Sequence, residues 1–162
     1  MRERTLVKDL AAKADGPVTV GGWVEKLRDQ KRIQFVIVRD ETGDVQVTYP
    51  RPVINEEPDL DDALAATISG LTNGSFVWIT GELVHDERVK LGGLEIKLQN
   101  LEVVTLADPE TPIADDTSID KRLDWRFLDL RRSEMNLVFR IQTTIEHAWR
   151  TWWYENDFIE IG

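Results

Sequence analysis

An aromatic ring and an amide side chain share one predicted β-hairpin, in residues 33–49. Phe35 lies in the first apolar run of this segment and Gln46 lies in the second, with a short acidic turn between the runs. An exposed ring can stack on an unpaired nucleic-acid base, and an amide can hydrogen-bond to the edge of a base. If both side chains lie on one outer face, the pair is a candidate site for single-stranded RNA.

The register of the hairpin decides which face these side chains occupy, because successive side chains of a strand alternate between faces. An even-length turn around Glu41 and Thr42 pairs like with like and predicts an inner face of four valines, Val36, Val38, Val45 and Val47. The predicted outer face then holds Phe35, Ile37, Gln46 and Thr48. Two alternatives stay open: the outer face packs beneath a helix or loop, or the opposite register puts Phe35 and Ile37 inside.

The charge of the chain is unevenly distributed along the sequence. The net charge of −10 taken alone argues against a nucleic-acid binder. The acids, however, gather in residues 55–62, whereas residues 26–32 and 121–132 are basic. Arg28, Lys31 and Arg32 precede the Phe35 strand and could contact phosphate. The alternatives are that the charge runs are solvated faces, or that the acidity reflects a high-salt host.

The elements that must position these residues read as a mainly β domain. Strands are predicted at residues 17–28, 33–39, 44–49, 75–86 and 94–106, with a turn at 88–93. Gly21 and Gly22 predict a bulge or sharp bend in the first strand. A helix is predicted at residues 59–71, with Gly70 near its end. This order matches a five-stranded Greek-key barrel of the OB type, and a generic five-stranded sheet is the alternative.

A linker and a long helix follow the predicted barrel. Pro109, Pro112 and the acidic composition indicate a linker at residues 107–120. Ser133 is predicted to cap an amphipathic helix that runs to about Glu155 and ends at residues 156–157. Residues 158–162 are predicted to begin a strand. A strand that stops at the end of the chain indicates a piece of a longer protein.

Composition sets limits on several other classes of protein. The sequence has no apolar run long enough to span a membrane and no secretory signal, which predicts a cytoplasmic protein without a membrane partner. The absence of cysteine excludes disulfides and cysteine-based zinc sites. His85 and His147 are far apart in the sequence and read as ordinary polar residues, so we expect no metal site.

Several ordered motifs resemble one known family. The segment GGWVEKLRDQKRIQFVIVRDETGDVQVTY resembles the anticodon-binding OB domain of class IIb aminoacyl-tRNA synthetases, and VQVT after RDETG is most similar to archaeal-type aspartyl-tRNA synthetases. RVKLGGLEIKLQNLEVV is similar to the last two strands of that domain. RFLDLRR resembles the entry to the catalytic domain, and residues 138–162 look like class II motif 1. The resemblance implies an anticodon-binding domain at 1–106, a linker at 107–120 and the start of a catalytic domain at 121–162.

The resemblance also implies roles for individual residues. Phe35 would stack on an anticodon base, Gln46 would contact a base edge, and Arg28 would lie at the anticodon. Glu95 would accept a hydrogen bond from a base N–H, with an exposed ion pair as the alternative. Lys31 and Arg32 replace glycines that relatives often carry, and they would add contacts to the tRNA backbone.

Two further positions match residues that affect discrimination between tRNA(Asp) and tRNA(Asn) in archaeal-type enzymes. They are Glu25 and Lys90. Glu25 matches neither of the residues that the resemblance leads us to expect, so tRNA(Asn) stays open as a partner beside tRNA(Asp).

The full-length relatives condense aspartate with ATP, require Mg²⁺, and form homodimers through motif 1. For this chain, the resemblance implies a dimer-packing helix face of Ile141, Ile145, Trp149 and Trp152. Motifs 2 and 3 are absent, so we expect no catalytic residue, no bound cofactor and no aminoacylation by this chain alone. The alternatives are a truncated paralogue that binds tRNA or a protein without catalysis, and a relative of asparaginyl-tRNA synthetases.

Overall fold

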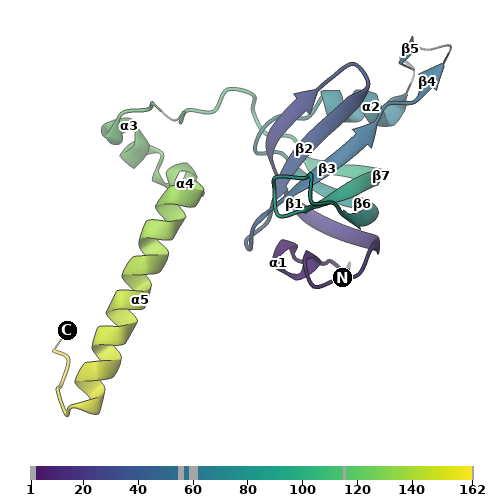
Figure 1. Cartoon of the computed structure of the whole chain (residues 1–162). Coiled ribbons are helices and arrows are strands. Elements are labelled where there is room, and N and C mark those ends of the chain that lie inside the picture. The colour runs from purple at the N-terminus through teal and green to yellow at the C-terminus, as the bar shows by residue number, and fades with distance from the viewer. Residues whose placement is uncertain (1–2, 55–56, 59–61, 115, 162) are drawn as a thin grey trace. The chain divides into compact units, whose positions relative to one another are not determined.

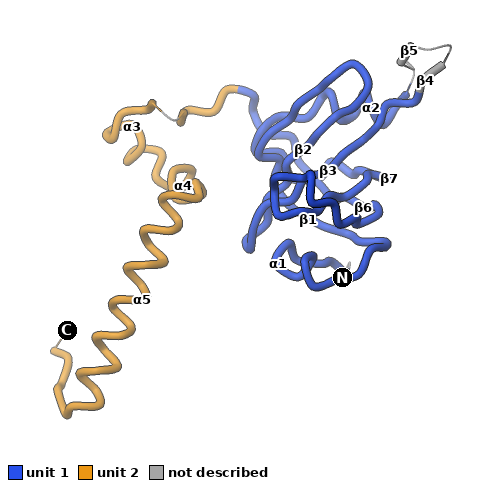
Figure 2. Tube along the Cα trace, in the orientation of Figure 1, with its two compact units in different colours: residues 1–109 blue, residues 110–162 orange. Residues whose placement is uncertain are grey.

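The computed structural model describes residues 3–54, 57–58, 62–114 and 116–161. The chain divides into two compact units, Met1–Pro109 and Glu110–Gly162, coloured separately in Figure 2. Each unit is described by itself.

The first unit is a closed five-stranded barrel (Figure 1). Its strands are β1 (Gly16–Asp29), β2 (Ile33–Arg39), β3 (Asp44–Pro50), β6 (Phe76–His85) and β7 (Leu94–Thr105), and they neighbour one another in the order β1-β2-β3-β7-β6. The pair β3 and β7 is parallel, and the other pairs are antiparallel. The predicted OB-type barrel is therefore confirmed, and the generic open sheet is excluded.

Short elements complete the barrel unit. Helix α1 (Val7–Leu10) precedes the barrel, and strands β4 (Val53–Ile54) and β5 (Glu57–Pro58) pair with each other. Helix α2 (Ala63–Ser69) lies between β5 and β6 in the chain. The Asp62 side chain caps α2 by accepting from Leu64 N, and Gly70 is its C-cap. The first residues of the predicted helix, 59–61, lie outside the described residues.

The hairpin of β2 and β3 adopts the predicted register. Val36 pairs with Val47 and Val38 pairs with Val45, and all four valines are at most 2% exposed. Phe35 pairs with Thr48, and Ile37 pairs with Gln46, on the other face. The opposite register is therefore wrong. Thr48, predicted on the outer face, is only 4% exposed; its register partners are Phe35 of β2 and Lys97 of β7.

Strand β1 pairs with two neighbouring strands, β6 along its first half and β2 along its second half. Residues up to Trp23 pair with β6, and residues from Trp23 onward pair with β2. The bulge predicted at Gly21 and Gly22 is wrong, because the register shift lies between Val24 and Lys26. The change of partner strand nevertheless falls at Trp23, directly after these glycines. Gly22 instead allows a close approach: a Cβ there would lie 2.5 Å from the carbonyl oxygen of Arg39.

The N-terminal helix α1 closes against the hairpin turn and was not predicted. The Asp40 carboxylate accepts a hydrogen bond from Val7 N over 2.8 Å, and Thr42 Oγ1 accepts one from Lys8 N over 3.0 Å. Leu10 at the end of α1 is fully buried in the barrel core. Donors of the first helical turn thus find acceptors in the turn between β2 and β3.

The second unit is helical. It contains α3 (Ile119–Asp124), α4 (Arg126–Asp129) and α5 (Ser133–Glu155). Ser133 is the first helical residue rather than the cap, because the backbone is already extended at Arg132 and Arg132 O accepts from Asn136 N. Asn156 ends α5 as predicted, and Asp157 has a positive φ of 62°.

The strand predicted at residues 158–162 is wrong over the described residues 158–161, which have no regular secondary structure. A strand needs a neighbouring strand to share its hydrogen bonds. Here Phe158 turns back onto α5, with its ring 5.8 Å from that of Trp152 and its N–H donating to Trp153 O over 2.9 Å. Among the helices that the structure describes, none combines the length and the apolar character needed to cross a membrane.

Candidate nucleic-acid interface

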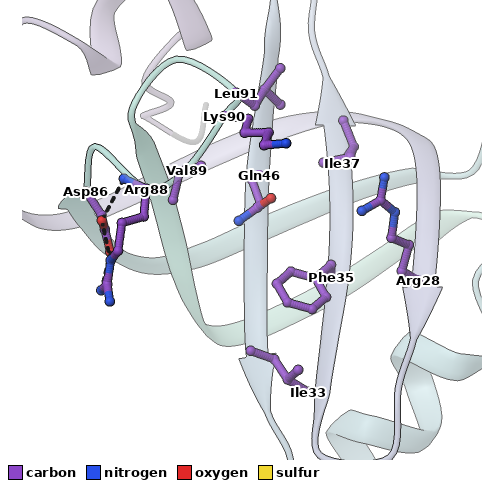
Figure 3. Close-up of a pocket in the computed structure, with 10 residues that line it drawn as sticks. All are labelled: Arg28, Ile33, Phe35, Ile37, Gln46, Asp86, Arg88, Val89, Lys90 and Leu91. Carbon is purple, nitrogen blue, oxygen red and sulfur yellow. Dashed lines mark hydrogen bonds and ion pairs between the residues drawn. The ribbon is translucent and has the colours of Figure 1, made fainter.

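A groove of about 850 Å³ lies on the outer face of β2 and β3 (Figure 3). Its floor comes from β1, β2 and β3, and one wall comes from the loop between β6 and β7. The lining residues are Arg28, Ile33, Phe35, Ile37, Gln46, Asp86, Arg88, Val89, Lys90 and Leu91. The groove combines an apolar floor with cations at its edges.

Phe35 lies on the floor of this groove. Its ring lies between Arg28 on one side and Gln46 on the other (Figure 3). Arg28 is its partner across β1 and β2, and Thr48 is its partner across β2 and β3. Phe35 is half-buried rather than covered. Among the described residues, no helix or loop covers the Phe35 ring completely. The ring is therefore available to a planar ligand.

Gln46 and Glu95 meet beside the ring. They are register partners in the parallel pair of β3 and β7. Gln46 Nε2 donates a hydrogen bond to Glu95 Oε2 over 3.2 Å. Glu95 therefore takes part in an amide–carboxylate hydrogen bond, which leaves further acceptor oxygens on both side chains. Its charge also interacts with that of Arg88.

The loop between β6 and β7 forms the second wall of the groove. Asp86 holds this loop by accepting from the backbone N of Arg88 over 3.0 Å and from its Nε and Nη2 over 2.9 and 2.7 Å. The Arg88 hydrogen bonds lower the pKa of the Asp86 carboxyl to about 2. Lys90 follows on the same wall, above Gln46 in Figure 3.

The remaining predicted residues are placed differently. Lys31 and Arg32 are exposed in the turn between β1 and β2. Glu25 lies at the register shift of β1 and accepts a hydrogen bond from Arg39 Nε over 3.0 Å. Within the described part of the chain, the groove lining includes Lys90 but not Glu25, Lys31 or Arg32. The structure therefore brings together four of the predicted residues, Arg28, Phe35, Gln46 and Lys90, with Glu95 joined to them through Gln46.

A polar cluster that the sequence did not reveal supports the start of the hairpin. Gln34 is fully buried and donates from Nε2 to Ser69 Oγ of α2 over 2.9 Å. Ser69 Oγ in turn donates to Asp29 Oδ2, and Arg51 Nη2 donates to Asp29 Oδ1, each over 2.6 Å. This cluster ties α2 to the ends of β1 and β2 from which Arg28 and Phe35 project.

Two other predicted features concern metal and dimer sites. Across the residues that the structure describes, no group of three or more His, Asp or Glu side chains could hold a metal ion. The predicted dimer-packing face of α5 is exposed, with Ile141, Ile145, Trp149 and Trp152 between 46% and 60% accessible.

Sequence comparison agrees with this fold. Residues 18–104 match the tRNA anti-codon family, described as an OB-fold nucleic acid binding domain. The match covers more than half of the chain and nearly all of the barrel. The chain belongs to this family of OB-fold nucleic acid binding domains.

Longer relatives extend the similarity beyond the barrel. The chain is 36% identical over 147 residues to the aspartate–tRNA(Asp/Asn) ligase of Methanospirillum hungatei JF-1, covering 87% of this chain and 32% of that protein. It is 34% identical over 154 residues to the enzyme of the same name from Haloferax volcanii, covering 93% and 34% respectively. The chain therefore spans about a third of the length of these relatives.

Several solved structures share the fold of this chain. The crystal structure of asparaginyl-tRNA synthetase from Pyrococcus horikoshii with asparaginyl-adenylate matches all of this chain and 36% of its own, with a TM-score of 0.84 and 26% identity. Aspartyl-tRNA synthetase from Entamoeba histolytica matches 99% of this chain and 39% of its own, with a TM-score of 0.78. At 21% identity, the second match supports the fold alone.

Proposed function

We propose that the barrel binds the anticodon loop of a tRNA and serves as the anticodon-binding part of an aspartate–tRNA ligase. One observation carries the proposal: the half-buried ring of Phe35 lies in the same groove as Gln46, which is hydrogen-bonded to Glu95. A stacking platform beside base-edge acceptors is how proteins bind unpaired bases. The similarity to aspartate–tRNA ligases supports the choice of RNA.

Each groove residue then has a distinct role. Phe35 stacks on one unpaired base, and Gln46 and Glu95 hydrogen-bond to a base edge. Arg28 faces the backbone beside the stacked base. Lys31 and Arg32, in the adjoining turn, add contacts to phosphates farther along the tRNA. Only contacts with base edges read sequence directly, so Gln46 and Glu95 recognise the base that they contact.

The parent protein is proposed to condense aspartate with ATP, with Mg²⁺ present, and to transfer the aspartyl group to tRNA(Asp). In this scheme residues 1–106 bind the anticodon, 107–120 link, and 121–162 begin the catalytic domain. The similarity to proteins named aspartate–tRNA(Asp/Asn) ligases supports tRNA(Asn) as a second partner. Glu25 and Lys90 are the positions proposed to affect that choice, and the cytoplasm is the proposed location.

A homodimer is proposed for the parent, packed through α5. The residues Ile141, Ile145, Trp149 and Trp152 follow helical spacing and are exposed in the single chain. A contiguous exposed apolar face of this kind is typical of a protein–protein interface.

Titration with RNA hairpins tests the proposed function. Labelled anticodon stem-loops with the aspartate, asparagine and scrambled anticodons are titrated with the 162-residue chain, and fluorescence anisotropy gives the dissociation constants. We expect tightest binding to the aspartate or asparagine anticodon. Phe35→Ala should weaken binding about 5- to 150-fold, because stacking contributes roughly 1–3 kcal/mol per base.

Phe127→Ala is the matched control. Phe127 is 63% exposed in α4, so the same truncation is made outside the groove. The control should bind like the unmodified chain, and thermal melting should show that both variants fold. Equal affinity for all three loops, unchanged by Phe35→Ala, contradicts the proposed function.

A further inference from the structure

The wall of the groove opposite Arg28 carries a second arginine, Arg88, which is exposed but hydrogen-bonded within its own loop. Arg88 is 91% exposed, yet its guanidinium is held by Asp86, whose side chain is only 23% exposed. Figure 3 shows this pair on one side of Phe35 and Gln46, with Arg28 on the other side. An RNA strand that places a base on Phe35 therefore has a cation at each edge of the groove.

The loop that carries Arg88 is internally hydrogen-bonded. Asp86 N donates to Gly93 O over 2.9 Å, Val89 N donates to Asp86 O over 2.9 Å, and Gly93 N donates to Val89 O over 3.0 Å. Gly92 and Gly93 have φ values of 73° and 69°, which favour glycine. The loop thus holds Arg88 at the groove before any ligand binds, which reduces the ordering that binding would otherwise require.

The pairing with Asp86 fixes which edge of the guanidinium faces outward. Nε donates to both oxygens of Asp86, over 2.9 and 3.2 Å, and Nη2 donates to Oδ2 over 2.7 Å. The hydrogens of Nη1 and the second hydrogen of Nη2 remain directed away from the carboxylate. Two such donors, side by side, match two oxygens of a phosphate.

Stability does not explain this arrangement. An exposed ion pair contributes little to the free energy of unfolding, so the pair holds an orientation more than it holds the fold. The Asp86 carboxylate is ionised at neutral pH, as an ordinary aspartate is, so the orientation persists under the conditions in which RNA binds.

We propose that Arg88 binds a backbone phosphate of single-stranded RNA at the groove edge opposite Arg28, in an orientation fixed by Asp86. The proposal rests on the proposed RNA-binding function and adds a residue to it. Arg88 contributes affinity without reading sequence, because a phosphate is the same at every nucleotide.

The salt dependence of binding tests this role. The dissociation constant of an anticodon stem-loop is measured at a series of KCl concentrations with the 162-residue chain. The logarithm of the association constant falls linearly with the logarithm of the salt concentration. Losing one phosphate contact on a single strand should make this slope less steep by about 0.7. Arg88→Gln should show this loss and weaken binding of the matched and scrambled loops by the same factor.

Two variants complete the design. Arg4→Gln removes the same charge from another ion-paired arginine of the barrel unit, which pairs with Glu41 at the hairpin turn, and should leave the slope within about 0.2 of the unmodified value. Arg88→Lys keeps the charge but loses the fork of donors, so the slope should persist while affinity falls.

The outcomes separate this inference from the proposed function. An unchanged slope for Arg88→Gln, or full affinity for Arg88→Lys, overturns the role of Arg88 even if Phe35→Ala weakens binding. If Phe35→Ala has no effect while Arg88→Gln lowers the slope, Arg88 binds phosphate and the stacking function fails. A chain that binds none of the loops overturns both.

Discussion

Gln46 and Glu95 form a hydrogen bond between two strands that lie far apart in the sequence, with Gln46 Nε2 donating to Glu95 Oε2 over 3.2 Å. The closure of the barrel creates this contact, because β3 and β7 are its parallel pair. With Nε2 engaged by the carboxylate, the amide oxygen of Gln46 remains an acceptor. The pair therefore presents acceptors, which suit the N–H groups of a base edge, beside the second hydrogen of Nε2, which remains a donor.

Replacing Glu95 should reduce discrimination between anticodons more than overall affinity. Glu95→Gln removes a charged acceptor and frees the Gln46 amide to rotate. We expect the ratio of affinities for matched and scrambled stem-loops to fall by about 1–3 kcal/mol, or 5- to 150-fold. Glu82→Gln, an exposed carboxylate of β6, is the control and should leave the ratio unchanged. A ratio that Glu95→Gln does not alter would remove Glu95 from base recognition.

Asp40 should stabilise both the hairpin turn and helix α1. Its buried carboxylate accepts from Val7 N, Thr42 N and Gly43 N over 2.8, 2.7 and 3.1 Å. Asp40→Ala leaves these donors unsatisfied and should lower the free energy of unfolding by about 1–3 kcal/mol. Hydrogen exchange should show the loss of protection concentrated at Val7 and Lys8.

The neighbouring Glu41 provides the comparison for Asp40. Its side chain is 51% exposed and pairs only at the surface with Arg4. Glu41→Ala should therefore change the free energy of unfolding by less than about 0.5 kcal/mol. Equal effects of the two substitutions would mean that Asp40 does not hold α1.

Asp29 should make stability depend on pH in the acid range. Burial raises the pKa of its carboxyl, but hydrogen bonds from Ser69 and Arg51 and the charge of Arg51 lower the pKa below its ordinary value of 3.8. Because the folded-state pKa is lowered, the ionised carboxylate stabilises the fold above the unfolded-state pKa. That stabilisation is lost as the pH falls through the folded-state pKa.

Urea unfolding from neutral pH to below the folded-state pKa measures this effect. The difference in unfolding free energy between the unmodified chain and Asp29→Asn should be constant at neutral pH and shrink as the pH falls below about 4. Asp9→Asn, an exposed residue of α1, removes the same charge as a control. A difference for Asp29→Asn that stays constant down to the lowest pH would show that the Asp29 cluster does not favour the ionised form.

The exposed face of α5 should drive self-association. Trp149 and Trp152 are 60% and 55% exposed, and the ring of Trp149 stacks on that of Trp153 at 6.4 Å. Sedimentation should show a mass that rises with concentration. Trp149→Asp should abolish that rise, whereas Tyr154→Asp should not, because helical spacing puts the 84% exposed Tyr154 on the opposite side of α5. A monomer at all concentrations would contradict the dimer proposal.

The core of the barrel could be predicted because alternation along a strand is a local property. The valines of β2 and β3 identify the buried face and leave Phe35 and Gln46 on the other face. The predicted register of the hairpin and the predicted burial of the valines are both confirmed. The position of the β1 register shift could not be predicted, because pairing of Val24 and Lys26 with β2 decides it.

Features that depend on contacts between distant residues could not be predicted from the sequence. Helix α1 is too short for a periodic pattern and is held by Asp40, 33 residues from Val7. Asp86 and Arg88 read as ordinary turn residues, and only the folded loop shows that they line the same groove as Phe35. Gln34 shares the inner face of β2 with Val36 and Val38, and only the folded structure shows that its amide donates to Ala65 O and Ser69 Oγ of α2.

The central claim is that Phe35 stacks on an unpaired base, and fluorescence of a base analogue measures this directly. An anticodon stem-loop carrying 2-aminopurine at each anticodon position in turn is titrated with the 162-residue chain. We predict that one position is quenched on binding and that saturating Phe35→Leu, which keeps an apolar side chain without a ring, leaves it unquenched. Equal quenching by Phe35→Leu at every position would contradict the claim.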